Sequence, residues 1–132
     1  MKKLLLLSLF ITSIYAQTLD CKNTNTTYNT MDCLKINILE AETVLNKYFT
    51  ESKKRYAYDT KLISLMDESQ KKWLSYRESE CSAVYQMWIE GSIRVIVAGN
   101  CRLDMTKKRT HEIWETYLTY QDSTPPILKN PN

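Results

Sequence analysis

Apolar side chains recur at steps of three and four along three stretches of the chain, a period that predicts three amphipathic helices. The first helix is expected to start at a cap on Asn29 or Thr30 and to end in the charged run 51–55. The second is expected over about 59–90, with Gly91 as a stop signal, and the third over about 101–118. The three inward stripes are Leu34, Ile38, Ala41, Leu45 and Tyr48; then Leu62, Met66, Ser69 or Gln70, Trp73, Arg77, Cys81, Val84 and Trp88; then Met105, Arg109, Ile113 and Tyr117.

The segments around these helices lack the helical period. Residues 92–99 are rich in β-branched side chains and lie between glycines, but a single strand has nothing to pair with, so we expect an apolar loop packed over the helices. The Thr- and Asn-rich residues 17–29 predict an irregular arm, and the residues after Gln121 predict an extended, mobile tail. The expected fold class is therefore all-α: a small three-helix bundle with an irregular N-terminal arm and an extended C-terminal tail.

Residues 1–16 have the pattern of a cleaved export signal. Lys2 and Lys3 precede the apolar residues 4–11, and Ala16 is a small residue at the expected cleavage point. This stretch is too short to span a bilayer, and no later segment is apolar enough to do so. A lipid-modified Cys21 is the alternative, which the charged Asp20 disfavours. We expect a periplasmic or secreted protein with a signal peptide (1–16), a helical domain (17–118) and a flexible tail (119–132).

The charge balance limits the classes of partner. The sequence carries a net charge of +3, and loss of residues 1–16 removes two lysines and no acid, which leaves +1. A partner attracted over long range must therefore respond to a local patch. The basic run near Arg55 is interpreted as a solvated helix end, and no nucleic-acid partner is predicted.

Four cysteines, Cys21, Cys33, Cys81 and Cys101, follow the leader, and exported thiols tend to be oxidised. Three pairings are possible. Antiparallel packing of the second and third helices would bring Cys81 to Cys101, which leaves Cys21 with Cys33. A zinc site is the competing interpretation, but there is no close Cys-x-x-Cys pair and His111 is the only histidine. We predict two disulfides, no metal and no cofactor.

Arg77 shares its helix stripe with aromatic side chains, and two interpretations remain open. Its stem can lie at a packing edge with the charged head in water. Alternatively, the guanidinium is a structural tie that binds carbonyls or a carboxylate across the helix interface, because an unpaired buried charge is costly.

These residues also carry a family resemblance. The run Gln70-Lys71-Lys72-Trp73-Leu74-Ser75-Tyr76-Arg77-Glu78-Ser79-Glu80-Cys81, followed by Gly91-Ser92 and then Cys101, resembles the LprI-like family of exported bacterial domains. The resemblance covers roughly residues 21–118 and implies a small helical fold stapled by cysteines, in a family named for lysozyme inhibition. The motif positions, most of them interpreted as structural, are Asn46, Gln70, Trp73, Tyr76, Arg77, Gly91, Thr106 and Arg109.

The residue chemistry points away from an enzyme. His111 lies among charged residues and is interpreted as solvated, and Glu78, Glu80 and Glu90 at helical spacing indicate surface charges more than a glycosidase pair. We expect a lysozyme inhibitor that occludes the cleft of its target. The alternative is a non-inhibitory cell-envelope interaction module that binds another exported protein or the wall.

The expected contact segment is 91–99, because it lies between glycines and carries Ser92 and Arg94. Animal lysozymes are typically basic, so the acidic side chains Glu78, Glu80 or Glu90 are expected near the contact.

Overall fold

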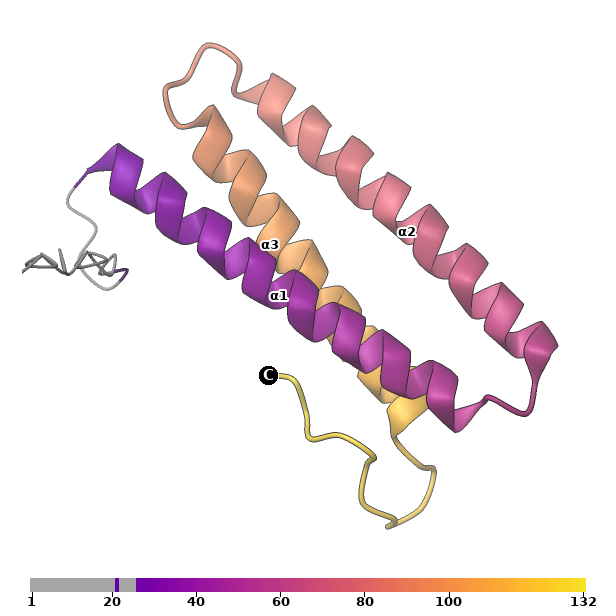
Figure 1. The fold of residues 1–132 in the computed structure, drawn as a ribbon. Helices are drawn as coiled ribbons and strands as arrows, with labels where there is room; N and C mark the ends of the chain where they lie inside the picture. Colours follow the sequence, from indigo (N-terminus) through magenta and orange to yellow (C-terminus); the bar gives the residue numbers. More distant parts are fainter. Residues whose placement is uncertain (1–20, 22–25) are drawn as a thin grey trace, which may run out of the picture.

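The computed structural model describes Cys21 and residues 26–132, and these residues form three helices and no strand (Figure 1). Helix α1 spans Thr27–Arg55, α2 spans Thr60–Met87 and α3 spans Arg94–Ile113. A five-residue π-helical turn, η1, continues α3 over Trp114–Leu118. The predicted all-α fold class is confirmed. The predicted signal peptide and most of the predicted arm lie outside the described residues.

The helix ends differ from the predictions by a few residues. Thr26, and not Asn29 or Thr30, caps α1, because its hydroxyl accepts a hydrogen bond of 3.1 Å from the Asn29 amide. Asp59 caps α2 in the same way, through the Leu62 amide. Helix α2 ends at Met87, short of the predicted end, because the following residues form a turn.

The predicted apolar loop over residues 92–99 is wrong from Arg94 onward, because these residues form the first turns of α3. Ile96 packs against the buried cluster of Leu34, Ala41 and Leu103. This packing stabilises a helical backbone here despite the modest helix propensity of β-branched residues. Gly99 allows the close approach of α1 and α3: a Cβ atom at this position would lie 2.5 Å from Cδ2 of Leu34.

Helix α3 lies centrally in the bundle. It packs against both α1 and α2, whereas α1 and α2 make few direct contacts with each other. Two apolar clusters hold the α1–α3 side together. The first contains Leu45, Tyr48, Ile113 and Leu118 with Phe49, Trp73, Trp114, Tyr117 and Leu128 around them, and the second contains Leu34, Ala41 and Leu103 with Ile38 and Ile96.

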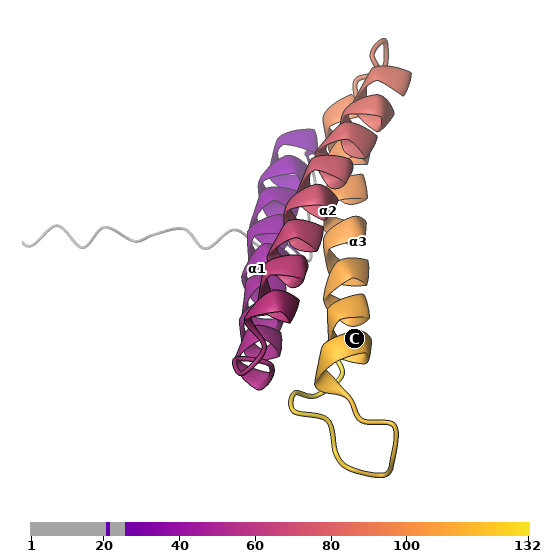
Figure 2. The same ribbon diagram turned by 90° about the vertical axis from the view of Figure 1, so that its right-hand side faces the viewer.

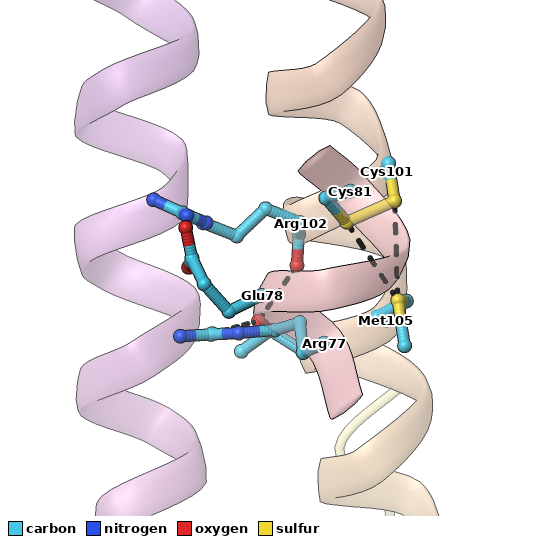
Figure 3. The surroundings of a disulfide bond; sticks show 7 residues. Arg77, Glu78, Cys81, Cys101, Arg102 and Met105 are labelled. Atoms are coloured by element: carbon cyan, nitrogen blue, oxygen red, sulfur yellow. Dashed lines mark hydrogen bonds and ion pairs between the residues drawn. A yellow bond between two sulfur atoms is a disulfide. The ribbon is translucent and has the colours of Figure 1, made fainter. Parts of the chain in front are cut away.

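Both predicted disulfides are present, Cys21–Cys33 and Cys81–Cys101, and no described cysteine is free. The second bond joins α2 to α3 (Figure 3). Its two Sγ atoms lie 3.7 and 3.9 Å from Sδ of Met105, a packing contact because a disulfide carries no S–H donor. The bond therefore clamps the α2–α3 hairpin near the end that carries its connecting turn.

The C-terminal tail contains no helix or strand, as predicted, but it returns to the bundle in a way that the sequence pattern did not anticipate. The Tyr48 hydroxyl donates to the Lys129 carbonyl at 2.8 Å, and Nε1 of Trp114 donates to the Leu128 carbonyl at 2.8 Å. Leu128 also packs against the first apolar cluster. These contacts join residues 128–129 to α1 and η1.

Candidate functional site

Arg77 ties the three helices together in the middle of the bundle. It is only 8% exposed, and its Nη1 lies 2.9 Å from Oε1 of Glu42 on α1. The same nitrogen donates to Oγ1 of the buried Thr106 on α3 at 2.7 Å. The Thr106 hydroxyl in turn donates to the Arg102 carbonyl. Of the two interpretations of Arg77, the structure therefore supports the structural tie.

Two guanidinium groups lie close to the Trp73 ring. Those of Arg77 and Arg109 lie 5.3 and 5.8 Å from its ring centroid, within the range of a cation–π interaction. Arg109 also donates through Nε to Oε1 of the buried Gln70 at 3.1 Å. Five of the predicted motif residues, with Thr106 included, thus meet at the contact of α2 and α3, where they join the two helices.

The remaining motif residues lie apart from this contact. Asn46 and Tyr76 are exposed on α1 and α2, and the structure shows no hydrogen bond from either side chain to another described residue. Gly91 lies in the α2–α3 connection, where its amide donates to the Trp88 carbonyl at 2.8 Å.

The α2–α3 connection forms an exposed apolar surface, which we call the hairpin tip and define as residues 87–93. Met87 is 73% exposed, and Trp88, Ile89 and Ile93 are 39–42% exposed. Figure 2 shows this connection lying beyond the N-terminal end of α1. Grouped exposed apolar side chains of this kind are typical of contact surfaces.

Arg94 forms hydrogen bonds to the α2–α3 connection and to α2. Its Nη1 donates to the Gly91 carbonyl at 3.1 Å, and its Nε donates to the Tyr85 hydroxyl at 3.0 Å. The predicted contact residue Arg94 is thus engaged within the hairpin, whereas Ser92 is exposed on the tip.

The three predicted acidic contact residues occupy different positions. Glu90 is exposed on the tip, and Glu80 is exposed on α2 with no ion pair to another described residue. Glu78 is paired with Arg102 on α3 (Figure 3). The structure therefore places one of the three at the tip and two farther down α2.

A groove of about 700 Å³ opens between α1 and α2, with α3 as its floor. Leu34, Ile38 and Gly99 contribute apolar surface, and Glu42, Glu78 and Arg102 line its charged side. Helices α1 and α2 both pack on α3 but make few contacts with each other, which leaves room for this groove.

In the described part of the chain, no three His, Cys, Asp or Glu side chains lie close enough together to hold a metal ion. His111 is half-buried against Trp114, and its Nδ1 lies 3.1 Å from Nδ2 of Asn132.

A stapled helical domain with this Trp73–Arg77 contact agrees with the resemblance drawn from the sequence. The sequence model of the family described as "Lysozyme inhibitor LprI" matches residues 20–113. The chain belongs to the LprI family. No curated protein and no solved structure matches it significantly.

The match to the LprI family ends at Ile113, the last residue of α3, so it includes the hairpin tip and the motif residues. The family description associates LprI proteins with lysozyme as inhibitors. Disulfides fit an LprI protein that functions outside the cytoplasm. Among the described helices, none combines the length and the apolarity that a membrane crossing requires.

Proposed function

We propose that this LprI protein is exported with the aid of a signal peptide over residues 1–16 and inhibits a lysozyme by placing the hairpin tip in its sugar-binding cleft. The observation that carries the proposal is the grouping of Met87, Trp88, Ile89 and Ile93 on an exposed turn within the family domain. An inhibitor of this kind performs no chemistry, because it only denies the cleft to the polysaccharide.

The tip is suited to this task because the fold holds it in place. The disulfide between Cys81 and Cys101 joins the two helices that carry it, and Arg94 bonds to the Gly91 carbonyl inside the turn. A loop that is ordered before binding loses less conformational entropy in the complex, which raises affinity.

We propose a contact segment that differs from the one expected from the sequence. Residues 94–99 belong to α3, and Gly99 is packed against Leu34, so the proposed contact moves to residues 87–93. Ser92 and Glu90 remain in it as polar residues at the rim of the apolar surface, whereas Arg94 becomes its support.

The proposal is tested by a turbidity assay in which the purified mature protein is added to lysozyme and cell walls. Wild-type protein should inhibit lysis in a dose-dependent manner. The double variant Ile89→Ser/Ile93→Ser should raise the inhibition constant about tenfold or more, because central apolar contacts dominate binding energies. Its melting temperature should stay near that of the wild type, since both side chains are already substantially exposed.

The matched control is Leu65→Ser, which removes a similarly exposed apolar side chain from α2 away from the tip. This variant should inhibit like the wild type. An unchanged inhibition constant in the tip variant would move the contact surface elsewhere. No inhibition by the wild type at large molar excess over several lysozyme types would refute the inhibitor and favour the envelope interaction module.

A further inference from the structure

The charges of the bundle are segregated along its length, although the net charge of the mature chain is close to zero. The Glu42–Arg77 ion pair divides the described residues into two halves. The tip half comprises residues 26–41 and 78–104, which include the hairpin tip. The base half comprises residues 43–76 and 105–132, which include the α1–α2 connection and the tail.

The tip half carries six acids against three bases, a net charge of −3, and the base half carries eleven bases against seven acids, a net charge of +4. The acids of the tip half are Asp32, Glu40, Glu78, Glu80, Glu90 and Asp104. The two ends of the described bundle therefore carry opposite net charges, and the negative end is the one that exposes the apolar tip.

We infer that the hairpin tip docks on a lysozyme of net positive charge, and that the negative tip half orients the inhibitor tip-first during approach. This inference rests on the proposed inhibition and names the charge class of its target. The apolar tip supplies the contact area, whereas the surrounding acids favour basic partners and repel acidic ones. The positive base half turns the opposite end of the bundle away from the same partner.

The rate of association should depend on salt, which the nearly neutral net charge of the chain alone would not predict. Association with a basic lysozyme should be fast at low salt and slow down as salt rises, because a Debye length of about 10 Å at 0.1 M screens the charges of the two ends. Dissociation, which depends on the packed contact, should change little with salt.

The test is a stopped-flow or biolayer measurement of binding to a basic lysozyme, with two double variants that change the net charge equally. Glu80→Gln/Glu90→Gln removes two exposed acids from the tip half, and Glu115→Gln/Asp122→Asn removes two exposed acids from the base half. The first should lower the association rate constant about threefold or more at low salt, with the difference lost above about 0.3 M salt. The second should retain at least the larger part of the wild-type rate.

The possible results distinguish failure of the oriented docking from failure of the proposed lysozyme inhibition. Equal slowing in both double variants would show that only the net charge matters. Equal rates in all three proteins would show that charge does not affect association. Either result would overturn the oriented docking but leave the proposed inhibition of lysozyme untouched. Fast, tip-dependent binding without inhibition of lysis would refute cleft occlusion and leave the oriented docking in place. Absence of binding by the wild type at low salt would overturn both.

Discussion

The Arg77 side chain connects all three helices of the bundle. Helices α1 and α2 scarcely touch, so the Arg77 contacts with Glu42 and Thr106 supply a bridge that packing does not. The sequence placed Arg77 on an inward stripe but left its partner open, because the carboxylate lies 35 positions earlier and on a helix whose rotation the pattern fixes only coarsely. The cation–π contact with Trp73 follows from the i, i+4 spacing, which is visible in the sequence.

Replacement of Arg77 by Met should destabilise the protein by about 2 to 3 kcal/mol, because it leaves the Glu42 carboxylate without its partner and removes a charged hydrogen bond to a buried hydroxyl. The measurement is urea-induced unfolding followed by circular dichroism.

Arg102→Met is the matched control, since Arg102 also pairs with a glutamate but lies in a more exposed position. Its expected cost is below about 1 kcal/mol. Similar losses in the two variants would contradict the assignment of Arg77 as the central tie.

The stability of the fold depends on pH in the alkaline range because of the Tyr48 hydroxyl. Burial raises the pKa of its hydroxyl above the ordinary value of 10.0, so the folded chain keeps this proton where the unfolded chain has lost it. Stability therefore falls as the pH rises beyond about 10, since the unfolded state binds fewer protons there.

Tyr48→Phe removes both the titration and the hydrogen bond to the Lys129 carbonyl. Near pH 8 we expect the variant to be less stable by about 1 kcal/mol. Towards about pH 11 the difference in unfolding free energy between the two proteins should shrink. Only the wild type loses stability there, because its Tyr48 hydroxyl ionises more easily in the unfolded chain than in the folded one. A difference that stays constant or widens over this range, measured by urea unfolding at each pH, would contradict the effect.

At the scale of the elements, sequence periodicity located three helices but misplaced the start of α3. Val95, Ile96 and Val97 have low intrinsic helix propensity and lie between glycines, so local preference disfavours a helix there. The packing of Ile96 and Gly99 against α1 decides the conformation, and this contact joins residues about 60 positions apart. The tail contacts escaped prediction for the same reason, because they too depend on distant partners.

Gly99→Ala tests the close approach of α1 and α3. Alanine would favour the helix by about 1 kcal/mol, but its Cβ atom would lie 2.5 Å from Cδ2 and 3.1 Å from Cγ of Leu34. Because overpacking of this kind costs about 1 to 3 kcal/mol, we expect a net loss of stability in thermal unfolding.

The same change in a Leu34→Ala background should become stabilising, because the clash is gone. A double-mutant cycle on the two positions should therefore show a coupling of about 1 kcal/mol or more. Stabilisation by Gly99→Ala in the wild-type background would show that the Leu34 side chain or the helices can shift at little cost, and would contradict the tight contact.

For the bundle as a whole, the sequence predicted the class of fold, the disulfides and the family, but not the shape of the contact surface that we propose. Cysteine positions and helix directions suffice to pair Cys81 with Cys101. The opposite charge of the two ends could not be anticipated, since it appears only when residues 26–41 and 78–104 lie at one end of the same bundle.

Removal of the disulfide by Cys81→Ala/Cys101→Ala should lower the free energy of unfolding by about 3 kcal/mol, because the bond closes a loop of sequence separation 20 in the unfolded chain. Urea unfolding of the double variant beside the oxidised wild type measures this loss. Chemically reduced wild-type protein should unfold at a similar or lower denaturant concentration. A double variant as stable as the wild type would mean that the bond does not constrain the unfolded chain.

The central position of α3 has a consequence for the order in which the protein can fold. During synthesis α1 and α2 emerge first, yet these two helices make few contacts with each other. The apolar clusters that contain Leu34, Ala41 and Leu45 are complete only when α3 and η1 have been made. A nascent chain that ends before α3 therefore has no stable globular state to collapse into. Such a chain stays unfolded until its final third has been made, which suits the export that we propose, in which the chain passes through a narrow channel before its cysteines are oxidised.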